Sequence, residues 1–488
     1  MVRKKTGLSF WMQRVLQECD RAALDFAPDP VHDLRVALRR CRSMADGVMA
    51  IDPDPAWKEM KKAGRRLFRQ LGELRDVHIM QEWVHKFDTV GDPVTSSILQ
   101  HLAARETELR QLAFQALEEF DRKQWRRWGK ELPRRAARLR QGSAIFKHLA
   151  LERWTEAYDL HRRALRNRSQ TAFHQLRIGI KRFRYIVENF LPQQHEAWKD
   201  DLKEMQDLLG EVHDLDVLWA TALQVAVFPD AESKSRWHGR ILEERSRRIE
   251  KYHVKMVGPN SRWNAWRAEL PHGEQIEKAA LLRLKLWASL LDPDFTHSTR
   301  VANLALQLYD GLQAIKPAIH EQNSRKVLHL AALLHDVGRS HHAKGHHKET
   351  YRLVHRLRSP LGIRKHDLDA AAIVARYHRG ALPRTGKKTL KSLPPAEKRE
   401  IQHLAGILRL ANAFDAERNG HTQRLQVSQK NGFFTVAAQG YSARSASAET
   451  VAAARHLLEV VYRRPVMIRP LRPRKPRVQR RVPSQTAK

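Results

Sequence analysis

Residues 31–42 read VHDLRVALRRCR, and residues 173–184 repeat the pattern as FHQLRIGIKRFR. A second pair of similar segments follows, LGELRD at residues 71–76 and LGEVHD at residues 209–214. The copies are offset by 142 and 138 residues, which indicates an internal duplication. The sequence therefore predicts two similar helical halves within roughly residues 1–270, which face one another across a shared surface.

Each copy of the repeat places basic side chains along one stripe of its predicted helix. Their spacing is i, i+3, i+7 and i+10, and residues at that spacing share a helix face. Stacked like charges destabilise an isolated helix by about 0.2–0.5 kcal/mol per pair, so a stripe that occurs twice suggests an anion that neutralises it. Arginine offers forked donors to phosphate oxygens, and lysine offers a point charge. The candidate contacts are His32, Arg35, Arg39 and Arg42 in the first copy and His174, Arg177, Lys181 and Arg184 in the second.

The alternative for these stripes is a solvated face whose cations pair with acids of the same chain. The candidate acids are Glu73, Asp76, Glu211 and Asp214, which belong to the second repeated motif. A single basic helix would favour this alternative, whereas duplication of the whole stripe favours an anion site. A further basic run over residues 122–140 is predicted to be solvated.

Composition excludes several classes of protein. The chain has 488 residues and a formal charge of +35, of which residues 1–270 carry +12 and residues 271–488 carry +23. A hydrophobic content of 42% with 12 Trp excludes a wholly disordered chain, and 29% charged residues without a long apolar run exclude an integral membrane protein. Two cysteines, Cys19 and Cys41, cannot form a disulfide framework or a thiolate zinc site. Because no secretory signal is visible, we expect a cytoplasmic protein. Charge alone does not choose between nucleic acid, polyphosphate and anionic lipid as a partner, or simple solubility.

The order of patterns along the chain predicts a mainly α protein. Up to residue 420 apolar residues recur three and four apart, and breakers fall between these runs. The segment LQVSQK-NG-FFTVAA carries Asn431-Gly432, which predicts a hairpin between two short strands, and a helix follows from Ala452 to Tyr462. Residues 469–488 hold eight basic residues, four prolines and no acid, and we expect them to be disordered. The predicted domains are a helical domain at 1–270, an all-helical domain at 271–420, a small α+β appendage at 421–468 and the basic tail.

The duplicated motifs resemble those of the CHAD family, the conserved-histidine α-helical domains. The pattern H-x-L-R-[VI]-x-x-[RK], followed by L-G-E and an Asp, occurs twice, and the resemblance covers roughly residues 5–270. It implies a pair of four-helix halves enclosing a basic surface that binds inorganic polyphosphate. The eight stripe residues would then be the polyphosphate contacts, and the protein would be associated with polyphosphate granules.

A second group of candidate residues combines histidines with one aspartate. The segments are FTHSTRVA at 295–302, AALLHDVG at 331–338, GHHK at 345–348 and ARYHR at 375–379. An adjacent His and Asp can approach one cation from a single helix end, with a distant histidine completing the set. Such ligands suit Mn, Fe or Zn, and carboxylate with water suits Mg. The alternative is that these histidines are structural or bind phosphate without turnover. A chain with 26 histidines is expected to bring some of them close together by chance.

These segments resemble the HD-domain phosphohydrolases, and more closely the HD-like C-terminal region of the exopolyphosphatase and guanosine pentaphosphate phosphohydrolase family. The resemblance covers about residues 280–465. Its metal ligands would be His297, His335 and Asp336, with His346 and His378 at a second metal or facing phosphate. The sequence leaves open whether His346 or His347 occupies the family position.

The chain departs from that family in two ways. The closing HD ligand is normally the Asp of a Leu-Ala-Asp element, and this chain has Asn412 there, with Asp415 three residues on as the alternative ligand. An amide brings no charge, so we expect weak binding of a divalent metal. The actin-like ATPase-type domain that carries the family's hydrolytic chemistry has no counterpart in this sequence.

The leading prediction is a polyphosphate-binding protein with a degenerate HD-like domain. The first alternative is a metal-dependent HD phosphohydrolase that acts on polyphosphate or phosphorylated nucleotides. The second is a nucleic-acid-binding protein, although no base-reading motif is evident. Neither a P-loop nor a glycine-rich dinucleotide motif is present.

Overall fold

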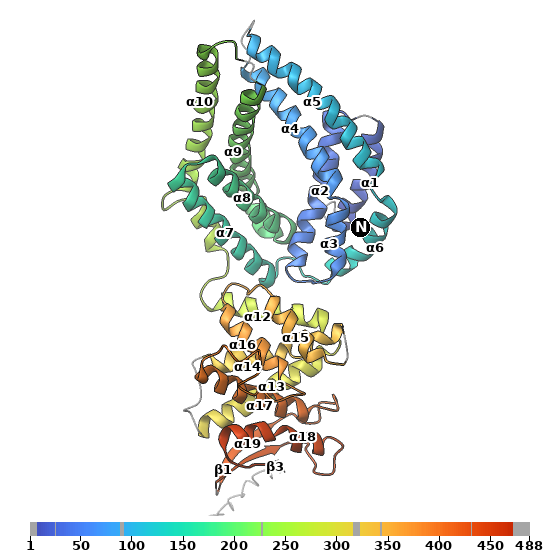
Figure 1. The fold of residues 1–488 in the computed structure, drawn as a ribbon, viewed down its shortest axis with the longest axis vertical. Coiled ribbons are helices and arrows are strands. Elements are labelled where there is room, and N and C mark those ends of the chain that lie inside the picture. Colours follow the sequence, from blue (N-terminus) through green and yellow to red (C-terminus); the bar gives the residue numbers. More distant parts are fainter. Residues whose placement is uncertain are drawn as a thin grey trace, which may run out of the picture. The chain divides into compact units, whose positions relative to one another are not determined.

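The computed structural model confirms a mainly α fold (Figure 1). It divides the chain into two compact units, Met1–Arg283 and Leu284–Lys488. Among the described residues no helix is long and apolar enough to cross a membrane. The described residues are 7–24, 26–87, 92–225, 228–315, 323–341, 344–430 and 432–471.

The first unit consists of two helical halves, as the repeat predicts. Each half contains two pairs of packed long helices: the first long helix packs on the second, and the third packs on the fourth. The first half, blue to cyan in Figure 1, contains α1 (Leu8–Leu24), α2 (Pro28–Met49), α3 (Pro55–Ala63), α4 (Arg65–Phe87), α5 (Pro93–Glu118) and α6 (Arg122–Ala136). The second half, mainly green, contains α7 (Ala144–Asn167), α8 (Gln170–Phe190), α9 (Pro192–Val225), α10 (Ala231–Met256) and α11 (Arg262–Ala268).

Helix α8 shows how the sequence builds these halves. The Ser169 hydroxyl accepts a hydrogen bond from the Ala172 amide and so caps the helix N-terminus. Apolar residues three and four apart, such as Leu176, Ile180 and Phe183, are fully buried, as an amphipathic helix requires. A Cβ at Gly179 would lie 2.9 Å from a Leu160 methyl carbon of α7, so the glycine permits close packing of the two helices.

The two halves meet along α2 and α8, and along α4 and α9, which are the helices that carry the repeated motifs. Near the C-terminal ends of α2 and α8 the packing is tight, since a Cβ at Gly47 would lie 2.2 Å from the Phe190 ring. Beside it the Asn189 amide donates to the Ser43 hydroxyl at 3.0 Å, and an ion pair joins Arg40 to a glutamate of α8. The duplicated helices therefore form the seam between the halves.

The second unit begins within α12 (Glu274–Leu291) and is helical up to residue 414. Helix α13 packs on α14 and α17, and α16 packs on α14 and α15. These elements are α13 (Phe295–Ile315), α14 (Ser324–Leu334), the 3-10 helix η2 (Val337–Ser340), α15 (His346–Arg356), α16 (Lys365–Arg376) and α17 (Pro395–Phe414).

A three-stranded sheet follows in the order β1-β2-β3, and the predicted hairpin supplies its first two strands. Strand β1 (Leu425–Lys430) pairs antiparallel with β2 (Phe433–Ala438), and Gly432 has φ +81° at the turn, whereas Asn431 lies outside the described residues. The helix expected from Ala452 is divided into α18 (Ala448–Ala454) and α19 (His456–Tyr462).

The start of the expected disordered tail was predicted wrongly. Residues 469 and 470 end strand β3 (Val466–Pro470), which pairs in parallel with β2. The non-local partner strand supplies the backbone hydrogen bonds that a short basic segment lacks by itself. The remaining part of the predicted tail, residues 472–488, lies outside the described residues.

Candidate functional site

Four of the eight predicted anion contacts come together at the seam of the first unit. We call Arg35, Arg39, Arg177 and Lys181 the cation cluster. Helix α2 supplies the first two and α8 the last two, and Lys181 interacts electrostatically with all three arginines. Asp76 of α4 and Asp214 of α9 lie among these cations. The duplicated stripes thus face one another, as the sequence predicts.

The cluster is half-buried, and its charge is only partly compensated. Among the described residues none of its four cations makes an ion pair within 4.0 Å, and the Arg177 Nε is buried without a hydrogen-bond partner. Burial, followed by the three neighbouring arginines, lowers the pKa of Lys181 to about 7. Burial also raises the pKa of Asp214 to about 6, although Arg177 and Lys181 oppose the shift. The free site is therefore electrostatically unfavourable, and an anion would relieve it.

The acids proposed as alternative partners divide into two groups. Glu211 pairs with Arg248 of α10, and Glu73 lies 3.9 Å from Arg69 of its own helix, so neither neutralises the cluster. Asp76 and Asp214 lie among the four cations and offset only part of their charge. Pairing within the chain is therefore incomplete.

The other four predicted contacts lie outside the cluster. Arg42 donates to the Lys61 carbonyl at 2.6 Å and lies over the Phe68 ring, and Arg184 is 3.9 Å from Glu188. His32 is exposed and near Arg75 and Arg39. The His174 and His213 Nδ1 atoms are 3.3 Å apart, which places this pair beside Arg177 and Lys181. Arg75 and His213 also lie near the cations but were not predicted as contacts. They occupy equivalent positions in the two copies of the L-G-E motif, so the repeat could have indicated them.

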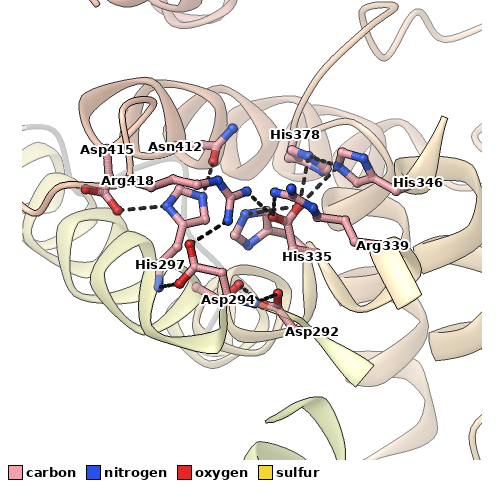
Figure 2. A network of polar contacts seen from close by, with 12 residues as sticks. Asp292, Asp294, His297, His335, Arg339, His346, His378, Asn412, Asp415 and Arg418 are labelled. Atoms are coloured by element: carbon pink, nitrogen blue, oxygen red, sulfur yellow. Dashed lines mark hydrogen bonds and ion pairs between the residues drawn. The ribbon is translucent and has the colours of Figure 1, made fainter. Parts of the chain in front are cut away.

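The second unit brings the predicted histidines around one carboxylate (Figure 2). We call His297, His335, Asp336, His346 and His378 the histidine–aspartate centre. Asp336 Oδ1 lies 3.6 Å from His335 Nε2, 3.1 Å from His346 Nε2 and 3.8 Å from His378 Nε2. Two trios with metal-ligand geometry share this aspartate: His297 with His335, and His346 with His378. His346, rather than His347, belongs to the centre.

Backbone carbonyls orient two of the imidazoles toward Asp336. The Nδ1–H of His335 donates to the Ala332 carbonyl, and that of His378 to the Ala375 carbonyl, each at 2.7 Å. Their Nε2 lone pairs therefore face the centre, and His335 Nε2 is buried without a hydrogen-bond partner. Burial lowers the pKa of both histidines, although the nearby Asp336 acts in the opposite direction. These residues fit a divalent metal, because neutral imidazoles and a carboxylate are suitable ligands.

Arginines occupy the other oxygen of the central carboxylate. Asp336 Oδ2 accepts from Arg418 Nη2 at 2.6 Å and from Arg339 Nη1 at 3.2 Å. Burial opposes ionisation, yet the neighbouring His335 and His346 hold the pKa of Asp336 well below its usual range. The carboxylate is thus ionised and shared between imidazoles on one side and guanidinium groups on the other.

His297 is held differently from the other histidines. Its Nδ1 lies 2.7 Å from Asp415 Oδ2, and its Nε2 lies 3.0 Å from Asn412 Oδ1. Asp415 also accepts from Arg300 Nε and the Gly420 amide, so it supports His297 and lies outside both trios.

A pocket of about 650 Å³ opens beside this centre. Its lining residues come from α13, η2, the segment after α16, α17 with the residues that follow it, and α18. The lining residues are His297, Arg339, His378, Arg379, Gly380, Arg409, Asn412, Ala413, Ala416, Arg418, Glu449, Thr450, Ala453 and Ala454.

Comparison with known proteins assigns both units. Residues 12–223 match the CHAD domain, and residues 285–444 match the Ppx/GppA phosphatase, domain III. The chain contains a CHAD domain and a Ppx/GppA domain III. Among solved structures it is similar to the CHAD domain from the plant Ricinus communis, with 20% identity, a TM-score of 0.36 and coverage of 54% of this chain and 88% of that one. No curated protein matches the chain.

The two domains together suggest a polyphosphate-related function. The CHAD domain carries a half-buried cluster of cations that make no ion pair among the described residues, and domain III combines a group of candidate metal ligands with an arginine-rich pocket. Both arrangements favour phosphate oxygens, the first by charge and the second by charge and hydrogen-bond geometry.

Proposed function

We propose that the CHAD domain binds inorganic polyphosphate in the cation cluster and that the protein associates with polyphosphate granules. The observation that carries this proposal is the set of four cations on facing helices without an ion-pair partner among the described residues. A polyanion would release counter-ions from both surfaces, which makes binding strongly dependent on salt. A flexible phosphate chain can bend to reach half-buried cations on two facing helices, whereas duplex DNA is a stiff, wide cylinder.

The direct test removes the cluster in one variant, Arg35→Ala, Arg39→Ala, Arg177→Ala and Lys181→Ala together. We expect most binding of long-chain polyphosphate to be lost while the helical circular dichroism persists. The slope of log affinity against log salt should fall by about one for each lost contact. Unchanged affinity would show that the cluster is not the site.

A matched control removes four exposed cations of α6, which lie outside the cluster. The control variant is Arg126→Ala, Arg127→Ala, Lys130→Ala and Arg134→Ala, with the same change in net charge. Its affinity should stay within a few-fold of the parent, since diffuse surface charge contributes weakly at physiological salt. An equal loss in both quadruple variants would mean that net charge, rather than the seam, determines binding.

Competition with duplex DNA separates this proposal from the nucleic-acid alternative. Polyphosphate bound to the protein should resist an equal phosphate concentration of duplex DNA. Equal competition would favour the nucleic-acid function. Granule association is tested by the position of a fluorescent fusion in cells with and without polyphosphate.

A second candidate function is metal-dependent phosphohydrolysis in domain III. The observation that favours it is the buried, unpartnered Nε2 of His335 directed at Asp336, next to His346 and His378. A bound divalent ion would supply Lewis-acid activation for attack on phosphorus. Arg339 and Arg418 lie on the same carboxylate and would neutralise charge that develops on a phosphoryl group.

This candidate is tested by metal analysis of the purified chain and by phosphate release from polyphosphate and nucleotides. The variant His335→Ala should lose both metal and turnover, while His355→Ala, on an exposed helix face, should keep both. Turnover that survives His335→Ala or strong chelation would rule out this centre as its source.

A further inference from the structure

Four arginines line the pocket of domain III, and they come from separate parts of the chain. Arg339 belongs to η2, Arg379 follows α16, Arg409 lies on α17 and Arg418 follows that helix. Separate elements that direct guanidinium groups into one concave wall make a preformed site, because the fold holds the charges together.

Two of these arginines lack an acidic partner among the described residues. Arg379 is exposed, and no hydrogen bond or ion pair to it occurs in that part of the chain. Arg409 donates from its two Nη groups to the Tyr377 and Gly380 carbonyls, each at 3.0 Å. A guanidinium has five N–H donors, so Arg409 retains donors for a ligand after fixing its own position.

Asn412 places a neutral amide at the position where HD proteins have a metal-binding carboxylate. Its side chain lies 3.0 Å from His297 Nε2 and lines the pocket. A carboxylate at this position would attract a cation and repel a phosphate. An amide can donate to a phosphate oxygen, and thus matches the arginines around it.

Among the described residues the rest of the lining offers no aromatic side chain on which a nucleobase could stack, and its other polar members are Glu449 and Thr450. A volume of about 650 Å³ would admit a nucleotide, so the chemistry of the wall decides. The lining contains no Phe, Tyr or Trp, and its apolar part consists of four alanines. The rings of His297 and His378 are only 1% and 3% exposed and are hydrogen-bonded through their nitrogens, so neither presents a face for stacking.

We propose that this pocket binds an inorganic oligophosphate without a metal, through Arg339, Arg379, Arg409, Arg418 and Asn412. The site lies in domain III and depends on neither the cation cluster nor turnover. If the second candidate function holds, the same pocket would receive its substrate. A nucleotide would bind only through its phosphates, with the nucleoside contributing no affinity.

The test uses the full chain with the four cluster residues replaced by alanine, so that the CHAD domain does not contribute. Tripolyphosphate is titrated calorimetrically in the presence of EDTA at fixed ionic strength, with ATP, GTP and UTP as comparison ligands. We expect one tripolyphosphate site, with the three nucleotides similar to one another and none tighter than tripolyphosphate. Absence of binding in EDTA, or a nucleotide that binds at least tenfold tighter than tripolyphosphate, overturns the proposal.

Variants locate the site. Arg379→Gln, at an exposed position that does not support the fold, should weaken tripolyphosphate binding by roughly tenfold to a hundredfold. Asn412→Asp should weaken it by at least as much, because it replaces a donor by a negative charge. Arg352→Gln, on the exposed face of α15, is the matched control and should change little. Retained affinity in both Arg379→Gln and Asn412→Asp would refute the assignment. The titration uses a chain without the cation cluster, so its result does not depend on whether that cluster binds polyphosphate. The two proposals can therefore be refuted independently.

Discussion

Lys181 predicts a pH dependence that belongs to the polyphosphate site. Burial and three arginines lower its pKa from 10.5 to about 7, so half of the free protein lacks this charge near neutral pH. A polyanion in the cluster favours the charged form and returns the pKa toward 10.5. Binding is then coupled to the uptake of one proton, which we expect to be measurable.

The sign and size of the effect follow from linkage. The bound state has the higher pKa, so the contribution of Lys181 to binding is fully present below pH 7 and is lost as the pH rises toward 10.5. Affinity should fall about tenfold per pH unit above 7, or roughly a hundredfold between pH 7 and pH 9. Terminal phosphates only gain charge over this range, which would act in the opposite direction.

The assay is binding of a labelled long-chain polyphosphate between pH 6 and pH 9 at constant ionic strength. The variant Lys181→Met should bind more weakly at pH 6 and should lose most of the decline above pH 7. The same variant should be more stable than the parent when free, by up to ~5 kcal/mol, because it removes a charge that the fold holds unfavourably. A parent affinity that is flat from pH 7 to pH 9, or a Lys181→Met variant that binds like the parent, would refute this reasoning.

Other variants probe the remaining parts of the molecule. Asp214→Asn should strengthen polyphosphate binding several-fold at pH 7 and above, because it removes a carboxylate with a pKa near 6 from among the cations; binding constants at pH 5 and pH 8 check this. Gly47→Leu should lower the free energy of unfolding by at least ~2 kcal/mol, since its Cβ would overlap the ring opposite, whereas Gly210→Ala, with open space around it, should not destabilise; urea denaturation compares them. Asn412→Asp should raise the content of divalent metal, and Asp415→Ala should not remove metal directly, because that carboxylate lies behind His297; elemental analysis decides.

The internal repeat made the two helical halves of the first unit predictable, and four of the eight predicted stripe residues meet where the halves contact. A stripe at 3.6-residue spacing requires only local helix geometry, and its duplication implied two facing copies. Arg42 and Arg184, both at i+10, lie outside the cluster although i+10 is only about 20° from i+3 around the helix, so position along the helix and not helix face separates them. Further along the same helices Gly47 packs against Phe190.

The second unit was less accessible to such reasoning. The Asn431-Gly432 turn predicted β1 and β2 because hairpin pairing is local, whereas β3 pairs with β2 only after two helices intervene. The histidine motifs predicted which residues gather around Asp336, since a bound ion needs ligands of those kinds. They did not indicate that Asp415 supports His297.

The sequence alone determined the helical character, the two-fold repeat, the residues of the cation stripes and the substitution at position 412. Each of these features is local in the sequence, within a few helical turns, or follows from the similarity between the two internal repeats. Only the tertiary structure decided which four cations meet, that Asn412 lies beside His297 and that Arg339, Arg379, Arg409 and Arg418 line one pocket. Those facts depend on contacts between segments far apart in the chain, and packing rather than local propensity sets such contacts.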